Sequence, residues 1–280
     1  MQAVKSQARV RFGGHLVDVD QFDAFLFGVT TNEVELMDPQ QRLLLEVSWE
    51  VLQSGGHQRQ VMADQPRLKN TAVYVGIQQM EYGSLAAQHI TAMGAFSATG
   101  TPFSVAAGRL SFTYGFTGPA VSIDTACSSA MVGTHMAVQH LQRNPGSALS
   151  SGVNLLLAER TTGAAQVAGM LTRDGHCKTL DKSADGYVRA ETCIVLHLSV
   201  ADVASPSDAI AASAVLRSTF VNQDGRSSSL TAPNGPAQQA VIRGALAAAN
   251  LQPQDVMGLE MHGTGAVIPN AIPIKTKYGR

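Results

Sequence analysis

Hydrophobic and polar positions recur along the chain with two different periods, and these periods predict helices and strands in alternation. Between Asp38 and Gly55-Gly56 the apolar residues recur every three or four positions, as they do on one face of a helix. Asp38 is a favoured N-cap and Pro39 fits the first helical position, while the two glycines would end the helix. The pattern predicts two more helices, at 130–141 and 237–249.

Short apolar and β-branched runs without helical spacing predict strands. They cover 72–77, 120–123, 154–157, 193–198, 210–221 and 258–261, with a connector at 199–208. Strands that alternate with helices indicate a layered α/β core. The pattern alone leaves open whether the core is a doubly wound sheet or another arrangement of α/β layers.

Composition narrows the class of protein. A chain of 280 residues that is 45% hydrophobic can form one large domain or two halves that share a core. The formal net charge of −1 gives no electrostatic reason to expect binding to nucleic acid or to an anionic membrane. We expect no transmembrane helix, because no apolar run approaches the ~20 residues needed, and no signal peptide, because the first residues lack an apolar stretch.

Cysteine usage indicates the compartment. Cys127, Cys177 and Cys193 form an odd set without C-x-x-C spacing. This pattern argues against a disulfide framework and against a zinc site, and it favours a reducing compartment. We therefore expect a soluble cytoplasmic protein without a bound metal.

Cys127 is the strongest candidate for chemistry. It ends the predicted strand at 120–123 and precedes the predicted helix at 130–141, which places its thiol at a helix N-terminus. Unpaired backbone N–H groups and the positive end of the helix dipole stabilise a thiolate there, and the thiolate is the nucleophilic form. For a cysteine without this context, the alternative of a buried structural residue would be favoured.

The residues around Cys127 carry a family resemblance. Asp-Thr-Ala-Cys-Ser-Ser at 124–129 resembles the active-site signature of β-ketoacyl synthases, specifically the ketosynthase domains of type I polyketide synthases. Further segments resemble that family in the family's order, at 38–46, 106–111, 184–189, 221–226, 230–236 and 262–265. Together they extend from about Arg11 to Gly265.

The resemblance implies a thiolase-like, layered αβαβα fold built from two similar halves. Residues 1–203 would form a nearly complete N-terminal half that carries Cys127. Residues 204–280 would only begin the C-terminal half, which carries His262. By this comparison the chain is truncated at both ends, and we expect uncovered apolar faces that make the isolated chain unstable or prone to aggregate.

The resemblance also implies the reaction. Cys127 would accept an acyl group, and a malonyl-type extender would then lose carbon dioxide and attack the acyl-Cys carbonyl in a decarboxylative Claisen condensation. Both substrates would arrive as thioesters on the phosphopantetheine of an acyl carrier protein, so the chain itself would bind no cofactor. The implied partners are that carrier protein, other domains of a synthase and a second copy of the chain.

His262-Gly263-Thr264-Gly265 matches a second family motif. His262 would be the first of two catalytic histidines that donate hydrogen bonds to the thioester oxygen, and Thr264 would contact the pantetheine arm. The glycines would permit close approach of backbone and substrate. A histidine without such a frame is more often an ordinary surface or core residue.

The sequence departs from the family at several positions. Ala266 replaces the second threonine of the motif, and residues 268–273 lack both carboxylates of the usual Leu-Gly-Asp-Pro-Ile-Glu. Ala190-Glu191-Thr192 stands where Gly-Glu-Gly is usual. Arg280 precedes the positions of the family's lysine and second histidine. We therefore expect that Cys127 can be acylated but that this chain alone cannot condense.

Two other functions remain as alternatives. The first is a catalytically decayed ketosynthase-like partner or carrier-protein scaffold, and the second is a cysteine hydrolase that uses Cys127 and His262. A calcium loop at 18–23 is rejected because Phe22 occupies a ligand position. We expect structural or supporting roles for Arg109, His135, Asp185, Asn222 and Asp224.

Overall fold

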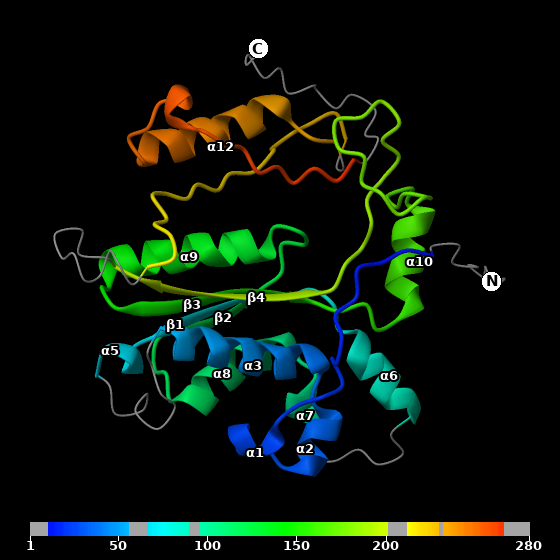
Figure 1. Ribbon diagram of the computed structural model, residues 1–280, viewed down its shortest axis with the longest axis vertical. Helices are drawn as coiled ribbons and strands as arrows, with labels where there is room; N and C mark the ends of the chain where they lie inside the picture. The colour runs from blue at the N-terminus through cyan, green and yellow to red at the C-terminus, as the bar shows by residue number, and fades with distance from the viewer. Residues whose placement is uncertain (1–10, 56–65, 90–95, 201–211, 230–231, 266–280) are drawn as a thin grey trace. The chain divides into compact units, whose positions relative to one another are not determined.

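The computed structural model describes residues 11–55, 66–89, 96–200, 212–229 and 232–265 (Figure 1). Its contacts separate into two compact units, which are described one at a time. The larger unit comprises residues 13–160 and 190–215, and the smaller comprises residues 1–12, 161–189 and 216–280. The division of the chain at residues 203 and 204 stays a prediction from the resemblance.

A four-stranded mixed sheet organises the larger unit, with the strand order β2-β1-β3-β4. The central strand β1 is buried at every position and runs parallel to both of its neighbours, whereas β4 pairs antiparallel with β3. The strands are β1 (Ala72–Gly76), β2 (Ala120–Ile123), β3 (Ser147–Asn154) and β4 (Thr192–Ser199). Three of the predicted strands, at 72–77, 120–123 and 193–198, are thereby confirmed.

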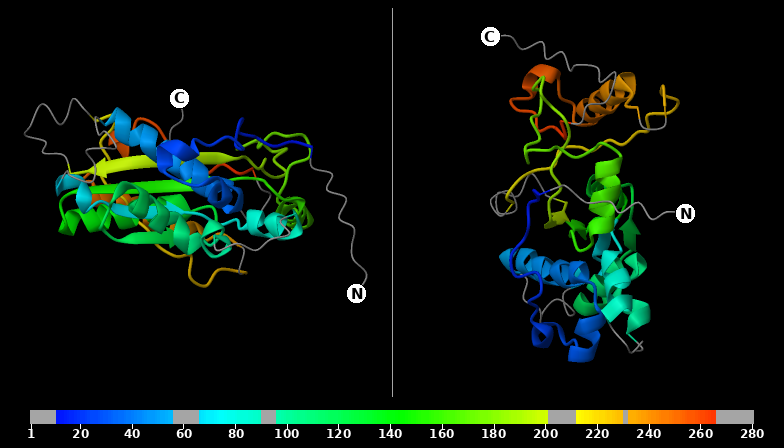
Figure 2. Two further views of the ribbon diagram at one scale, coloured as in Figure 1. Left: turned by 90° about the horizontal axis from the view of Figure 1, so that it is seen from below. Right: turned by 90° about the vertical axis from the view of Figure 1, so that its right-hand side faces the viewer.

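Helices cover both faces of this sheet (Figure 1). On one face lie α3 (Pro39–Ser54) and α8 (Phe103–Tyr114), and α3 crosses β4 in the left panel of Figure 2. On the other face lies α9 (Ser129–Arg143). The unit is therefore a three-layer α/β structure, as the alternating pattern predicted. The shorter helices are α1 (Ala24–Phe27), α2 (Thr31–Leu36), α5 (Pro66–Lys69), α6 (Glu81–His89) and α7 (Ser97–Gly100).

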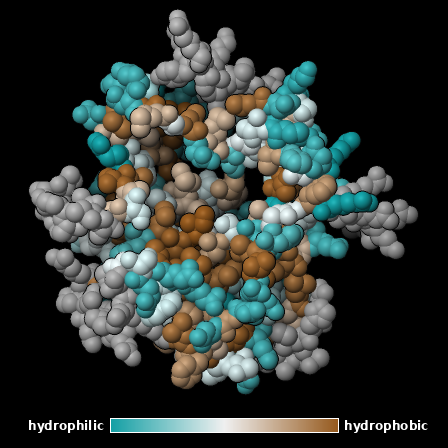
Figure 3. Space-filling model, viewed as in Figure 1, coloured by the Kyte–Doolittle hydropathy of each residue, from teal (hydrophilic) through white to brown (hydrophobic). Residues whose placement is uncertain are grey.

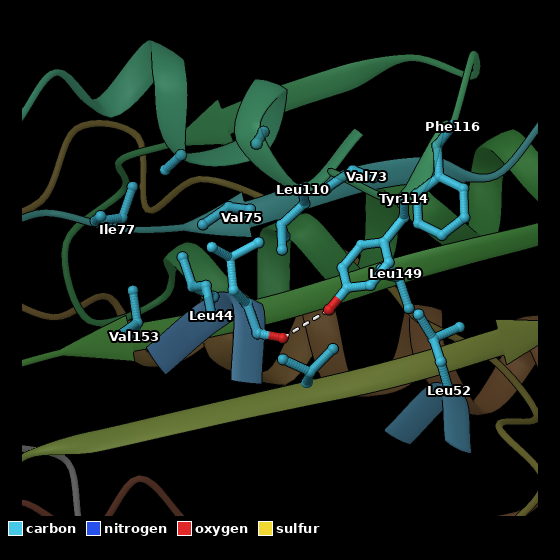
Figure 4. Packing of buried hydrophobic residues seen from close by; sticks show 14 of the residues in the cluster. Leu44, Leu52, Val73, Val75, Ile77, Leu110, Tyr114, Phe116, Leu149 and Val153 are labelled. Atoms are coloured by element: carbon cyan, nitrogen blue, oxygen red, sulfur yellow. Dashed lines mark hydrogen bonds between the residues drawn. The ribbon is translucent and has the colours of Figure 1, made fainter. Parts of the chain in front are cut away.

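The main hydrophobic core lies between the sheet and the layer of α3 and α8 (Figure 4). Val73 and Val75 of the central strand are fully buried there against Leu44 of α3 and Leu110 of α8. The one hydroxyl drawn in this cluster, that of Tyr114, donates to the carbonyl oxygen of Leu45 at 2.7 Å. Burial of the tyrosine therefore leaves its polar atom satisfied.

The boundaries predicted for α3 are confirmed. The Asp38 side chain accepts a hydrogen bond from the Gln40 backbone N–H at 2.9 Å, Pro39 is the first helical residue and Gly55 is the C-cap. Asp38 is almost completely buried, and burial raises its pKa to about 6. Gly56 lies outside the described residues.

The strand predicted at 154–157 is wrong, because β3 ends where that prediction begins. β3 contains three serines, a composition that obscured it in the sequence, yet their hydroxyls have partners. Ser150 pairs with the Thr134 hydroxyl at 3.0 Å and Ser147 with His197 at 2.7 Å. Ser151 contacts the Tyr74 carbonyl oxygen at 3.4 Å. A buried strand can be this polar only when each hydroxyl is hydrogen-bonded.

Two other predicted strands are wrong as well. Residues 212–221, the described part of the run at 210–221, and residues 258–261 adopt no regular structure. A strand is defined by pairing with a neighbour, and these segments pair with no strand among the residues described. Ser218 instead donates to the Ala245 carbonyl oxygen at 2.7 Å, so its segment lies along a helix.

The smaller unit contains α12 (Gly235–Ala248), the 3-10 turn Pro253–Asp255 and the part of α10 (Glu159–Val167) from Thr161 onward. Asn234 caps α12 by accepting from the Ala237 N–H at 3.3 Å. The predicted helix at 237–249 is confirmed, and it begins two residues earlier than predicted. Most of the predicted connector at 199–208 lies outside the described residues.

Hydrophobic side chains gather along β4 on the face seen in Figure 3. Ile194 is 58% exposed and Leu196 is 43% exposed, although both belong to a strand of the central sheet. The neighbours that alternate with them, Cys193 and Val195, pack in the core on the opposite face. Among the described helices, none has the length and apolar character required to cross a membrane.

Candidate active site

Cys127 lies in a tight turn between β2 and α9, and its thiol is exposed. The helix begins two residues later at Ser129, and the side chain of its N-cap, Ser128, makes no capping hydrogen bond. The N-cap side chain therefore accepts no hydrogen bond from the backbone N–H groups in the first turn of α9, and these groups point toward the turn that carries Cys127. The predicted strand–cysteine–helix arrangement is confirmed, and the alternative of a buried structural cysteine is contradicted for this residue.

The turn is held by short side-chain hydrogen bonds. The Ser129 hydroxyl accepts from the Thr125 N–H at 2.8 Å and donates to the Ala126 carbonyl oxygen at 2.6 Å. The Asp124 carboxylate accepts from the Ala126 N–H at 2.9 Å. Ala126 has φ +58°, the left-handed region that non-glycine residues seldom occupy. The residue before Cys127 is thus kept in an unfavourable conformation by its neighbours.

Two glycines allow the first turn of α9 to rest on the sheet. A Cβ at Gly76, which ends β1, would lie 2.5 Å from the Ala130 nitrogen. A Cβ at Gly152 in β3 would lie 2.7 Å from the Ala130 Cβ. Any larger residue would push the helix start, and Cys127 with it, away from the strand ends. Sequence reasoning missed both positions, although a glycine that closes a buried strand signals close backbone approach.

The other two cysteines differ from Cys127. Burial raises the pKa of the Cys193 thiol to about 12, and the nearby carboxylates of Glu50 and Glu46 add to the shift. Such a thiol stays protonated at neutral pH and is a poor nucleophile. Cys177 is half-buried in a loop of the smaller unit. Among the three, Cys127 has both the exposure and the helix N-terminus that a nucleophile requires.

His262 lies in the smaller unit within an irregular segment, and its side chain is exposed. We predicted that it ends a strand, and that part of the prediction is wrong. Gly263 and Gly265 have φ of +56° and +62°, so the glycines adopt the left-handed conformations for which glycine is suited. Thr264 is partly buried between them. Ala266 and the residues after it lie outside the described part of the chain.

A loop at residues 172–186 contacts the His262 segment. The Thr179 hydroxyl donates a short hydrogen bond to the Gly263 carbonyl oxygen, and the Gly186 N–H donates to the Gly265 carbonyl oxygen at 3.0 Å. Cys127 belongs to the larger unit, so each candidate is described within its own unit. The catalytic pairing of Cys127 with His262 stays a prediction.

Opposite charges meet within this loop. The Lys178 ammonium lies 3.0 Å from an Asp174 oxygen and 2.6 Å from an Asp185 oxygen. Hydrogen bonds from Lys178 and Thr172 lower the pKa of Asp174 to about 2, and the same two donors lower the pKa of Asp185. Asp185, expected as a supporting residue, thus belongs to a charge cluster. Lys178 and Asp185 of this cluster each directly precede a residue that hydrogen-bonds to the His262 segment, Thr179 and Gly186.

The other expected supporting residues have structural partners. Arg109 donates to Gln41 and pairs with Glu33, both at 2.6 Å, which ties α8 to α3 and α2. Asn222 donates to the Ala237 carbonyl oxygen at 2.8 Å, and an Asp224 oxygen accepts from the Asn234 N–H at 3.2 Å. These contacts hold the segment before α12. His135 is a partly buried residue of α9.

The substituted Gly-Glu-Gly position is accommodated. Ala190 lies against Gly14, where an added Cβ would come within 3.0 Å of the Ala190 Cβ. The Glu191 carboxylate accepts from the Leu16 and Leu156 backbone N–H groups, each at 3.0 Å. The alanine therefore faces a glycine, and the glutamate ties two separate segments to β4.

A mixed, helix-covered α/β sheet with an exposed cysteine at a strand–helix turn defines an α/β protein suited to nucleophilic chemistry at that thiol, and comparison identifies the family. Residues 2–203 match the model of the β-ketoacyl synthase N-terminal domain, and residues 213–274 match that of the C-terminal domain. The chain belongs to the β-ketoacyl synthase family.

Relatives and solved structures agree with this assignment. The chain is 42% identical over 264 residues to a phenolphthiocerol/phthiocerol polyketide synthase of Mycobacterium tuberculosis, covering 94% of this chain but 17% of that protein. It resembles the ketosynthase from module 6 of the bacillaene synthase of Bacillus subtilis 168 with a TM-score of 0.78 and 33% identity, over 91% of this chain and 42% of that chain. An oxazolomycin ketosynthase domain from Streptomyces albus JA3453 gives a TM-score of 0.79 at 33% identity, over 91% and 44% of the two chains.

Proposed function

We propose that this chain supplies the condensing centre of a modular polyketide synthase, with Cys127 as its nucleophile. The observation that carries the proposal is the exposed Cys127 thiol at the start of α9, in a chain of the β-ketoacyl synthase family. The Cys127 thiolate attacks the carbonyl carbon of an acyl thioester. The new Cys–acyl bond forms as the original carbon–sulfur bond breaks, and the departing pantetheine thiolate takes up a proton.

The second step uses a malonyl-type thioester. Its carboxylate leaves as carbon dioxide, and the electron pair of the broken carbon–carbon bond becomes an enolate. The enolate carbon attacks the acyl-Cys carbonyl and expels the Cys127 thiolate. Hydrogen-bond donors are needed where negative charge develops. We assign this work to the Cys127 N–H at the acyl carbonyl and to His262 at the malonyl thioester oxygen.

The proposed substrates are acyl and malonyl-type groups carried on the phosphopantetheine of an acyl carrier protein, with Thr264 at the pantetheine arm. The polyketide synthases among the relatives support this substrate class and a multidomain setting. The free thiols at positions 127, 177 and 193 suit a reducing compartment such as the cytoplasm.

We also propose a homodimer formed through β2. This strand pairs with β1 on one side and, within the described residues, has no neighbour on the other. An unpaired strand edge is a template for pairing with another chain. On α8, which packs against β2, Phe112 is 89% exposed and would be covered in such a dimer.

The two alternative functions gain no support. A decayed scaffold has no use for a strained, hydrogen-bonded turn that presents an exposed thiol. A cysteine hydrolase would leave the remaining family motifs without a role.

Intact-mass spectrometry after incubation with a short acyl-pantetheine thioester tests the proposal. We expect one acyl adduct on the wild-type chain and on Cys177→Ser, and none on Cys127→Ala. The Cys177→Ser variant is the matched control because it removes another thiol outside the core. An adduct that persists in Cys127→Ala, or a folded wild-type chain that takes up no acyl group, would contradict the proposal.

A further inference from the structure

The loop at residues 172–186 fits closely against the segment that follows His262. Two hydrogen bonds reach it, from the Thr179 hydroxyl to the Gly263 carbonyl oxygen and from the Gly186 N–H to the Gly265 carbonyl oxygen. A Cβ at Gly265 would overlap the Cys177 carbonyl oxygen, so the backbone of the His262 segment is in direct contact with the backbone of the loop at this point. The conformation of the His262 segment therefore depends on the position of the loop.

Lys178 holds this loop closed. Its ammonium pairs with Asp174 at 3.0 Å on one side of the loop and with Asp185 at 2.6 Å on the other. The Thr172 hydroxyl is buried and lies 2.9 Å from an oxygen of each of the same two carboxylates. One ammonium between two carboxylates thus joins the beginning and the end of the loop.

The backbone conformation on both sides of Thr179 is unfavourable. Lys178 has φ +42° and Leu180 has φ +63°, so both neighbours of Thr179 are non-glycine residues in the left-handed region. Leu180 is 80% exposed, so burial of its side chain does not compensate for the unfavourable backbone conformation. Such conformations persist where surrounding contacts enforce them, and they concentrate at functional sites. Partly exposed ion pairs add little to stability, so stability alone is a poor reason for this arrangement.

We propose that Lys178 is a positioning residue for His262. By bridging Asp174 and Asp185 it fixes the turn that presents the Thr179 hydroxyl to Gly263, and this contact orients the adjoining imidazole. The proposal rests on the assignment of His262 as a donor in the condensing reaction. It predicts that loss of the bridge disturbs His262 while the acylation of Cys127, in the other unit, continues.

The test combines two readouts on the full chain. The first is the set of NMR chemical shifts of the His262 imidazole in histidine-labelled protein, assigned with His262→Gln, together with amide exchange over residues 262–265. The second is acylation of Cys127 followed by intact mass. The variants are Lys178→Met, its charge-conserving counterpart Lys178→Arg, and the milder pair Thr179→Val and Thr179→Ser. Lys182→Met is the matched control, because Lys182 is an exposed lysine of the same loop.

We expect Lys178→Met and Thr179→Val to change the His262 imidazole chemical shifts and to speed amide exchange at 263–265 by about tenfold or more, because the segment opens locally. Lys178→Arg and Thr179→Ser should restore both, and Lys182→Met should change neither. Cys127 acylation should stay within about twofold of wild type in every variant.

Three outcomes would overturn the inference. The first is a set of unchanged His262 imidazole chemical shifts and unchanged amide exchange in folded Lys178→Met and Thr179→Val. The second is an equal disturbance by Lys182→Met, which would indicate a general effect of charge. The third is a parallel loss of Cys127 acylation, which would make Lys178 a general structural residue. If the wild-type chain fails to acylate, the proposed function fails, whereas the His262 readout still decides the positioning role.

Discussion

The Ser129 hydroxyl donates to the Ala126 carbonyl oxygen at 2.6 Å and so ties the first residue of α9 to the strained residue before Cys127. The same hydroxyl accepts from the Thr125 N–H at 2.8 Å. One buried side chain therefore spans the turn that carries Cys127. Because the turn sets both the direction of the thiol and its distance from the helix amides, Ser129 controls how the Cys127 thiol is presented.

Replacement of Ser129 by alanine should slow the acylation of Cys127 by about tenfold or more, since a small displacement of a reacting group has a large effect on rate. Ser128→Ala is the comparison, because the exposed Ser128 hydroxyl donates to the Thr125 carbonyl oxygen at 2.9 Å, one residue further from Cys127 than the Ala126 carbonyl that Ser129 holds. It should have the smaller effect. Rates of acyl-adduct formation by intact mass measure both variants. Equal rates for Ser129→Ala and wild type would show that the backbone alone holds the turn.

Ala126 provides a test of backbone strain. Its φ of +58° suits glycine and is most costly for a β-branched residue. We expect Ala126→Val to lower the free energy of unfolding by about 1–2 kcal/mol and Ala126→Gly to leave it unchanged or slightly raised. Denaturant unfolding at equilibrium measures both. A neutral Ala126→Val would mean that residue 126 leaves the left-handed region in solution.

The nucleophile turn could be predicted from sequence because local signals agree there. β-branched residues precede Cys127, and small hydroxyl residues and a helical pattern follow it. α3 could be predicted for the same reason, since Asp38, Pro39 and Gly55 all mark its ends. In both places the information lies within a few residues of the feature.

β3 and the His262 segment could not be predicted in this way. Ser147, Ser150 and Ser151 are compatible with a buried strand only because Thr134, Tyr74 and His197 satisfy their hydroxyls from other elements. The apolar run at 258–261 has strand character but no strand beside it among the described residues. Pairing and hydrogen-bond satisfaction are properties of the tertiary structure, so composition along the chain does not reveal them.

The exposed apolar face of β4 should make the chain self-associate. Ile194 and Leu196 present large hydrophobic side chains to solvent, and a contiguous apolar surface favours association. We expect the combined Ile194→Thr and Leu196→Thr variant to stay monodisperse at concentrations where the wild type forms larger species. Threonine is β-branched, a shape that suits a strand.

Light scattering coupled to gel filtration measures this difference. Val195→Thr is the control, because Val195 faces the core and its replacement should lower stability without reducing association. Identical association of the wild type and the double variant would exclude β4 as the surface through which the chains associate.

Asp38 should make stability depend on pH. Burial raises its pKa to about 6 from the ordinary value of 3.8. Between these values the folded chain holds a proton that the unfolded chain has released, so the free energy of unfolding falls as pH rises from about 4 to 6. The Gln40 side chain faces this carboxylate with its Nε2, which lies 3.3 Å from both Asp38 oxygens. Asparagine at position 38 would remove the buried charge and keep an oxygen for the cap.

We therefore expect Asp38→Asn to be more stable than wild type at neutral pH by about 1–2 kcal/mol, with the difference vanishing below about pH 4. Asp38→Ala should be less stable than Asp38→Asn at every pH, because alanine cannot cap the helix. Urea unfolding of the three proteins across this pH range measures the effect. A wild-type chain that gains stability from pH 4 to 6 relative to Asp38→Asn would show that Asp38 is ionised at no cost, with its charge satisfied by the N–H of Gln40.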